Sequence, residues 1–484
     1  MTQFSTNINK VPGLRFMADA LEIQSTPGRH RLLKLKLMNS AEEIAYHLDK
    51  VQLYKALIES QGNAAYSGRN TFEELKHELF ATHDISGTIS TIGTQIVLDD
   101  IGLFEIKKFA LNIEKIREIL LLSVSAVPDI QKEVEQFSGV TGIIDLLDPE
   151  RQRIPHFYIY DAYDENLVLM RRKFRAMDID GTESKEAESL RLQCEEIEDT
   201  VRKRLTDNLS QYKKALQHNL EVVADIDVWL AKADLAIKMG LIRPEPSEST
   251  RFTGLFNPSI AQSLKLRNKS WQPIDIDVFQ GPTLITGANM GGKTVLLKTI
   301  ALCQFLYQFG FFVPAEHATM KTFEKIMISM GDEQSELRGL SSFASEMIKI
   351  NGILLASKNK EKILALIDEP ARTTNPVEGL ALVRALIDHL IRYQTTSLVT
   401  THYTVNHPGC RRLRVAGLRT EQMPLKPNIE DIQDYMDYSL TEVKDDAEVP
   451  QEAISIASIL EVDEEFLDQA RHYLATPRSD NNGF

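Results

Sequence analysis

The apolar residues of this chain follow a different period in each half of the sequence. In the second half, three runs have the length of buried strands: residues 363–367 are apolar throughout, whereas residues 282–286 and 397–401 each combine an apolar pair with threonines. Residues 154–160 form an aromatic, β-prone segment in a first half that is otherwise helical in pattern. There, apolar residues recur every three or four positions and predict one long amphipathic helix, its stripe formed by Ile197, Val201, Leu205, Leu209, Tyr212, Leu216 and Leu220. The pattern predicts a mostly helical part followed by an α/β part.

A glycine-rich motif follows the first of the three apolar runs. The sequence there spells G-x-x-x-x-G-K-T, with Gly287, Ala288, Asn289, Met290, Gly291, Gly292, Lys293 and Thr294. Because an apolar helical stretch follows at residues 295–302, the motif lies between a strand and a helix N-terminus, where this pattern binds phosphate. Glycines let backbone N–H groups face the phosphates, Lys293 adds a positive charge, and the Thr294 hydroxyl can ligate Mg²⁺. A chance match in a turn is the alternative, but both flanks favour a nucleoside triphosphate site.

The other two apolar runs end on residues that suit the same site. Asp368 and Glu369 close the second run, where Asp368 can hold Mg²⁺ through water and Glu369 can act as general base on the attacking water. His402 follows the third run. A lone histidine is more often a core residue, whereas a strand end beside the other motifs favours a γ-phosphate contact. We therefore predict Lys293, Glu369 and His402 as catalytic residues, with ATP and Mg²⁺ bound.

Together these motifs resemble the nucleotide site of the MutS family of ABC-related ATPases. Ala288 stands where the family loop typically has Pro, and Thr-Thr-His-Tyr at residues 400–403 matches the family, as do residues 331–335 and 340–347. The resemblance implies an α/β P-loop NTPase of the MutS ABC type, preceded by an all-α core and lever domain. It divides the chain into a helical MutS-like core and lever domain at residues 1–240, a MutS-like P-loop ATPase domain at 241–420, and an acidic C-terminal segment with a helical dimerisation pair at 421–484.

The resemblance also implies a site shared between two chains. In the family, each nucleotide lies between one P-loop and a signature loop of the partner ATPase, so a homodimer is expected. By position, Ser341 and Ser342 would contact the partner's ATP, and residues 374–379 would cross the dimer interface. A capped helix N-terminus is the plainer interpretation of these serines, and both roles are compatible because such an N-terminus is an anion site. Trp271 would offer its face to the adenine, with a core aromatic as the open alternative.

Length and composition fit a globular protein of two or three domains. The chain has 484 residues, of which 43% are hydrophobic, and no apolar stretch approaches the length that spans a bilayer. Its three cysteines, Cys194, Cys303 and Cys410, lie far apart, which makes a disulfide framework unexpected. With a polar start in place of a signal peptide, the expected location is the cytoplasm, without membrane contact.

Charge is unevenly spread along the chain. The net charge is −14, and residues 421–484 carry 16 acidic and 4 basic residues, so the preceding part carries only −2. Basic clusters at residues 171–175 and 202–204 have acidic neighbours and are interpreted as solvated helix faces. Neither half shows the basic footprint of a stand-alone DNA-binding domain.

Three functions remain open from the sequence. Residues 26–34 resemble the start of the family's core domain, so the mismatch reader and connector of the repair members are expected to be absent. The family's clamp is also expected to be absent, because the helical stripe of residues 197–220 runs through with no β-rich insertion. The first function is a MutS-like ATPase that acts on DNA, as in mismatch repair, without its own mismatch reader. The second is remodelling of a protein client, because similar short ATPases are associated with reactivating cobalamin-dependent aminomutases such as lysine aminomutase. The third is a module that only reports nucleotide state, against which Glu369 argues.

Overall fold

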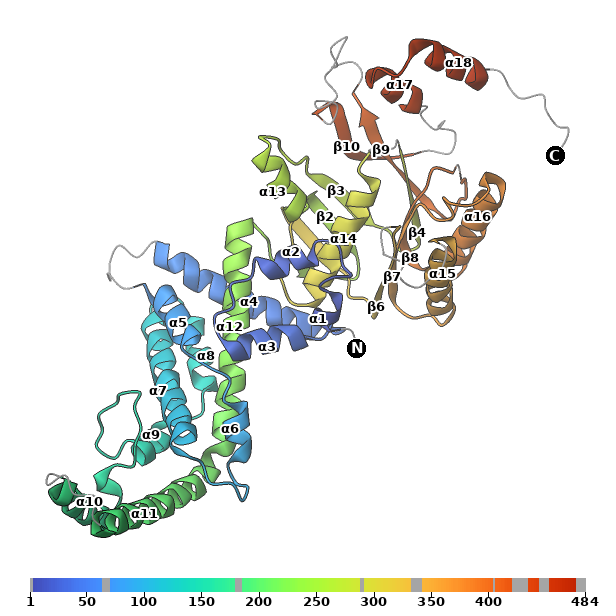
Figure 1. Ribbon diagram of the computed structural model, residues 1–484. Coiled ribbons are helices and arrows are strands. Elements are labelled where there is room, and N and C mark those ends of the chain that lie inside the picture. The colour runs from blue at the N-terminus through green and yellow to red at the C-terminus, as the bar shows by residue number, and fades with distance from the viewer. Residues whose placement is uncertain are drawn as a thin grey trace.

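The helical half predicted from the apolar spacing is present. The computed structural model describes residues 3–62, 70–178, 185–287, 291–331, 342–403, 405–419, 434–443 and 452–475. Figure 1 shows the helix α12 as a long rod that runs through the helical part toward the sheets. The helices are α1 (Phe4–Asn7), α2 (Leu14–Asp19), α3 (Thr26–Lys34), α4 (Ala41–Gly62), α5 (Thr71–Phe80), α6 (Ser86–Thr91), α7 (Asp100–Ser123), α8 (Gln131–Gln136), α9 (Thr141–Leu147), α10 (Glu165–Asp178), α11 (Lys185–Leu209) and α12 (Lys213–Met239), with 3-10 turns η1 (Pro128–Ile130), η2 (Asp161–Tyr163) and η3 (Ser210–Tyr212).

Residues 154–160, β-prone by composition, form no strand. Their polar groups turn instead to Lys107 of α7, whose side chain is fully buried. The Lys107 ammonium donates hydrogen bonds to the His156 carbonyl (2.9 Å), the Tyr160 hydroxyl (2.8 Å) and Oδ1 of Asp148 (3.0 Å). A buried charge needs such partners, and this need overrides the local β propensity.

The apolar stripe predicted as one helix is divided between two. Helix α11 ends at Leu209, the turn η3 follows, and α12 begins at Lys213. The side chain of Tyr212 turns toward α9, where a Cβ added at Gly142 would lie 2.3 Å from the Tyr212 hydroxyl oxygen. The stripe is nevertheless buried at Val201, Leu205, Leu209 and Leu216, so the predicted face is correct although the helix is interrupted.

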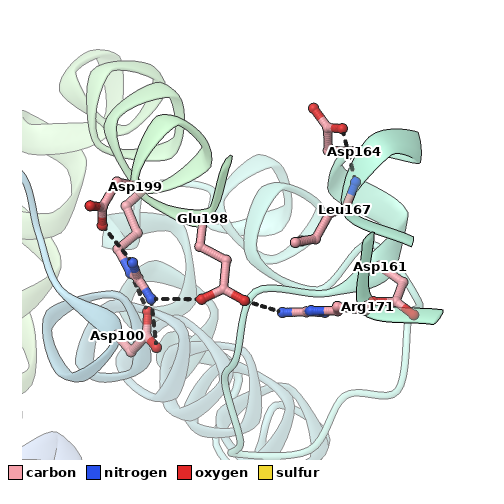
Figure 2. Close-up of polar contacts among 8 residues, drawn as sticks. Asp100, Asp161, Asp164, Leu167, Arg171, Glu198 and Asp199 are labelled. Carbon is pink, nitrogen blue, oxygen red and sulfur yellow. Dashed lines mark hydrogen bonds and ion pairs between the residues drawn. The ribbon is translucent and has the colours of Figure 1, made fainter. Parts of the chain in front are cut away.

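The two basic clusters of the helical part are engaged with carboxylates. Arg171 of α10 contacts Oδ1 of Asp161 through Nη1 (2.5 Å). Its Nη2 contacts Oε1 of Glu198 (2.7 Å), as Figure 2 shows. Arg202 of α11 donates through Nε to Oδ1 of Asp100 in α7 (2.8 Å). These contacts link α7, α10, α11 and η2, and they direct one arginine of each cluster toward protein rather than solvent.

Two sheets form the α/β half. The first has the order β1-β5-β2-β3 and the second the order β10-β9-β4-β8-β7-β6, with β10 antiparallel to β9 and the other pairs of the second sheet parallel. The strands are β1 (Glu245–Pro246), β2 (Thr250–Leu255), β3 (Ile274–Val278), β4 (Pro282–Thr286), β5 (His317–Met320), β6 (Lys325–Ser329), β7 (Ile363–Asp368), β8 (Thr396–Thr400), β9 (Arg411–Leu418) and β10 (Met436–Glu442). The helices are α13 (Pro258–Leu266), α14 (Lys293–Gln308), α15 (Ser342–Lys358), α16 (Pro376–Arg392), α17 (Glu452–Ile459) and α18 (Glu464–Ala475).

The second sheet brings the three predicted strand ends together. Strand β4 pairs with β8, and β8 pairs with β7, so Ile285 and Asp368 are both register partners of Thr400. Ligands of open α/β sheets bind outside the carboxyl ends of such parallel strands. Strand β10 lies beyond the predicted boundary at residue 420 yet pairs with β9, so the sheet extends past that boundary.

The helical part packs against the far end of α14. The Met38 N–H donates to the Gln308 carbonyl (2.9 Å), and Nε2 of Gln308 donates to the Met38 carbonyl (2.8 Å). Nζ of Lys232 in α12 donates to the Phe309 carbonyl (2.7 Å). Helix α14 therefore joins the glycine-rich loop at its start to the helical part at its end.

The last two helices lie beside one another, beyond β9 and β10 in Figure 1. Helix α18 exposes the large side chains of Phe466 (61%) and Tyr473 (77%). The dimerisation role expected for this pair stays a prediction. Among the described residues, no helix is both long and apolar enough to cross a membrane.

Candidate functional site

The glycine-rich loop connects β4 to α14 as predicted. Gly287 follows β4 with φ 138°, and Gly292, at φ 73°, is the N-cap of α14. A Cβ at Gly287 would lie 3.1 Å from the Val415 Cβ, so both the backbone angle and the close approach of β9 require glycine. Helix α14 presents its N-terminus, with its unpaired N–H groups and partial positive charge, to this loop. Ala288, Asn289 and Met290 lie outside the described residues.

Lys293 places its charge inside the loop. Lys293 is only 5% exposed, and its Nζ donates a hydrogen bond to the Gly287 carbonyl (2.9 Å). A buried ammonium next to a helix N-terminus is a strong local positive charge. The arrangement suits binding of a polyphosphate.

The two predicted Mg²⁺ contacts are neighbours. The Thr294 hydroxyl donates to Oδ2 of Asp368 (2.9 Å), and the Thr400 hydroxyl donates to Oδ1 (2.6 Å). A hydroxyl and a carboxylate are the hard oxygen donors that Mg²⁺ prefers, and Mg²⁺ commonly takes one or two protein ligands, with waters and substrate phosphates as the rest. Across the described ranges, no group of three or more His, Cys, Asp or Glu side chains is placed to hold a metal alone. The donor set therefore fits Mg²⁺ held jointly with phosphate.

Glu369 is oriented by three neighbouring groups. Its backbone N–H donates to the Thr400 hydroxyl oxygen (2.9 Å). Oε1 lies 2.6 Å from Nε2 of His402, and Oε2 accepts from Nη1 of Arg372 (3.3 Å). The Glu369 side chain is 16% exposed, whereas that of Arg372 is 71% exposed. His402, predicted to reach the γ-phosphate, is thus adjacent to the predicted general base.

A pocket of about 780 Å³ opens beside the loop. Gly291 and Gly292 form one side of it, and Trp271, Met436 and Tyr438 lie on others. Trp271 lines this pocket, as a residue that contacts adenine would. It also donates from Nε1 to the Leu255 carbonyl (3.1 Å) and packs on the core, as a core aromatic would. The pocket has a size typical of small-molecule sites.

Tyr438 forms the pocket wall next to the loop. A Cβ at Gly292 would lie 3.0 Å from a ring carbon of Tyr438. The backbone around it is fixed by Gln272, which accepts from the Tyr438 N–H (3.1 Å) and donates to Asp437 (2.8 Å). Burial opposes ionisation of Asp437, but hydrogen bonds from Gln272, Ser439 and Arg419 outweigh it and hold the pKa of Asp437 well below its usual range.

Sequence reasoning missed several residues of this site. Thr400 belongs to the same Thr-Thr-His-Tyr motif as His402, and its position at a strand end was the available signal. Arg372 is three residues from Glu369 but belongs to no motif we assigned. Met436 and Tyr438 come from β10, beyond the predicted ATPase boundary, and only the sheet pairing brings them to the loop.

Of the two predicted partner-facing serines, one belongs to α15. Ser341 lies outside the described residues, and Ser342 opens α15 but its side chain is likewise not described. Their contact with a second nucleotide site stays a prediction.

Comparison with known proteins agrees with this geometry. Residues 283–476 match MutS domain V, a P-loop ATPase domain. Similar curated proteins include the endonuclease MutS2 of Brevibacillus brevis, 36% identical over 219 residues that cover 44% of this chain and 27% of that protein. The endonuclease MutS2 of Caldanaerobacter subterraneus is 32% identical over 249 residues (51% and 30%), and that of Thermomicrobium roseum 31% over 330 residues (65% and 40%). The chain thus spans less than half the length of these relatives. The domain V match places residues 283–476 in the MutS family, and these relatives support that membership.

Proposed function

We propose that this chain binds ATP with Mg²⁺ and hydrolyses it. The observation that supports the proposal most directly is the meeting of Lys293, Asp368 and Glu369 at the carboxyl ends of β4, β7 and β8. A charged loop, a carboxylate suited to Mg²⁺ and a second carboxylate beside it are the parts that phosphoryl transfer to water requires. The adjacent pocket has room for the nucleoside.

Each residue has a defined task in this proposal. Lys293 and the N-terminus of α14 bind the β- and γ-phosphates by charge and N–H donation. Thr294 and Asp368 would hold Mg²⁺, which when bound neutralises phosphate charge. Glu369 accepts the proton of the attacking water, and His402 and Arg372 hold its two carboxylate oxygens in one orientation.

The proposal includes two chains and a conformational signal. By family resemblance, two ATPase domains enclose each nucleotide, with Ser341 of one chain at the site of the other. Nucleotide binding at the start of α14 would reach the helical part through Gln308 and Phe309 at its other end, which bond to Met38 and Lys232. A ligand that favours one arrangement of this helix shifts the populations of the whole molecule.

Two substitutions test the chemistry. Lys293→Ala is expected to abolish ATP binding, because the phosphates lose their main side-chain charge. Glu369→Gln is expected to retain ATP binding but lower turnover by about a hundredfold or more, since an amide cannot accept the proton. Fluorescent-nucleotide titration and phosphate release measure the two effects.

A matched control keeps the result specific. Glu196→Gln makes the same change on an exposed face of α11, far from the loop, and should retain the turnover of the unmodified protein. If the Glu369 variant also hydrolyses ATP at that rate, the general-base assignment is wrong.

Two candidates for the molecule on which the ATPase acts follow from the family resemblance and from the charge distribution of the chain. The relatives are named endonucleases, and family resemblance makes DNA the first candidate for what the ATPase acts on. A protein client, such as a cobalamin-dependent aminomutase awaiting reactivation, is the second. It is favoured by the −12 balance of residues 421–484 and by the carboxylate partners of Arg202 and of Arg171, the latter visible in Figure 2.

A mobility-shift assay with a labelled DNA duplex separates the two clients. Contacts to DNA phosphates release counterions, so affinity should fall by orders of magnitude between about 50 and 200 mM salt if DNA is bound. Absence of a shift at the lower salt concentration would favour the protein client.

A further inference from the structure

The loop after Glu369 is held in an unfavourable backbone conformation. Glu369 has φ 45° and Ala371 has φ 59°, with Pro370 between them. Left-handed angles are costly for residues with a Cβ, so they persist only where surrounding contacts impose them. Ala371 is fully buried, which places those contacts in the interior rather than in solvent.

Helices α15 and α16 both contact this loop. The Ala371 N–H donates to Oε1 of Glu346 in α15 (2.7 Å). In α16, a Cβ at Gly379 would lie 3.1 Å from the Ala371 carbonyl oxygen and 2.3 Å from the Tyr403 hydroxyl, so that helix packs closely on the same turn. Helix α16 contacts the loop by close packing, whereas Glu346 of α15 accepts a hydrogen bond from it.

Glu346 has no assigned role in the proposed chemistry. It is partly buried, and burial raises its pKa above the usual range, while the Ala371 N–H and the Arg372 charge act in the opposite direction. Arg372 contacts Oε2 of Glu369, so one guanidinium lies within the electrostatic reach of both carboxylates. Glu346 is thus connected to Glu369 by the loop backbone and by Arg372.

We propose that Glu346 is a positioning residue that fixes the orientation of Glu369 by accepting the Ala371 N–H. The proposal rests on the proposed hydrolysis of ATP through Glu369. Helix α15 begins at Ser342, directly after the predicted partner-facing Ser341. A displacement of α15 by the partner subunit would therefore reach the chain's own general base through the Glu346–Ala371 hydrogen bond and the loop backbone, and would couple the two sites of a dimer.

The test compares Glu346→Ala and Glu346→Gln in the full chain with Mg²⁺-ATP. Glu346→Ala removes the acceptor and should lower kcat by about tenfold to a hundredfold, as small misplacements of a reacting group do, with KM and nucleotide affinity little changed. Glu346→Gln retains a side-chain oxygen that can accept the same N–H and should restore kcat to within about threefold of the unmodified protein. Asn351→Ala, an exposed change on the same helix, is the control.

The outcomes separate a positioning role from others. Unmodified kcat in Glu346→Ala overturns the proposal, as does a loss of kcat that only follows a lowered Tm or a smaller folded fraction. Equal loss in the Ala and Gln variants also overturns it, because charge rather than the hydrogen bond would then matter. If Glu369→Gln turns over normally, the proposed chemistry itself has failed; if that variant is inactive while Glu346→Ala is active, only the role of Glu346 has failed.

Discussion

Trp271 illustrates how one residue serves the core and the pocket together. Its ring lines the pocket next to the loop, and its Nε1–H is satisfied by the Leu255 carbonyl. A ring fixed in this way loses little entropy when a base stacks on it. The hydrogen bond orients the indole, and the exposed face is what a nucleotide would contact.

Replacing Trp271 separates these roles. Trp271→Ala is expected to weaken ATP binding by roughly 1 kcal/mol, about fivefold, and to weaken GTP by a different amount, because stacking depends on the base. Trp271→Phe keeps an aromatic face but loses the Nε1–H, so it should retain most of the ATP affinity. Nucleotide titrations of both variants measure this; equal losses for ATP and GTP would indicate packing alone.

Lys232 is a buried cation at the junction of α12 and α14. It donates to the Phe309 carbonyl, lies 4.3 Å from the centre of the Phe311 ring, and is influenced by Asp225 and Arg31. Burial lowers the pKa of Lys232 from 10.5 to about 7, with Asp225 raising it and Arg31 lowering it further. In the unfolded chain the ammonium is solvated and keeps its ordinary pKa.

This difference predicts a pH dependence of stability. Between pH 7 and 10.5 the unfolded state binds a proton that folded Lys232 has released, so the free energy of unfolding should rise with pH there, by up to about 1.4 kcal/mol per unit. Below pH 7 both states are charged and the contribution is constant. Lys232→Met has no such titrating group. Urea unfolding at pH 7, 8 and 9 should show the free energy of unfolding of the unmodified protein rising with pH relative to that of Lys232→Met; parallel curves would contradict the assignment.

At the scale of elements, the local sequence pattern predicted the strands and the loop whose structure depends on neighbouring residues. The strands at 282–286, 363–367 and 397–401 were predicted because their apolar residues are contiguous, and the observed β4, β7 and β8 agree with them within a residue. The loop from Gly287 to Thr294 carries its own signature, so its place between strand and helix was also predictable.

Elements determined by distant contacts escaped sequence reasoning. The break at Ser210–Tyr212 has no proline or glycine, and Tyr212 turns toward Gly142, far away in sequence. Residues 154–160 are β-prone alone but surround the buried Lys107. Tyr438 and Glu346 reach the site only through the pairing of β10 and the packing of α15. Such contacts leave no periodic trace in the sequence.

At the scale of the whole molecule, α14 and α12 form a continuous connection between the proposed nucleotide site and the helical part. Gln308 is fully buried and bonds both to Met38 of the helical part and to the Phe323 carbonyl of the α/β part. Since interfaces packed this closely respond by discrete rearrangement rather than gradual deformation, a shift of α14 would be passed on to α12. In the proposed cycle, a second chain would supply the remaining part.

Mixing two inactive variants tests whether two chains share one site. Ser341→Arg should disrupt the loop that a chain contributes to its partner's nucleotide site, while the glycine-rich loop of the same chain stays intact. Lys293→Ala should inactivate the chain's own glycine-rich loop and leave its contribution to the partner intact. In an equimolar mixture that pairs at random, half of the dimers contain both variants and each has one complete site. Turnover should therefore recover to about a quarter of that of the unmodified protein, because a two-fold dimer has two equivalent sites.

Phosphate release measures the recovery, and differently tagged chains verify that mixed dimers form. Mixed dimers without recovered activity would refute the role of Ser341, and a monomer with full activity would refute the shared site itself.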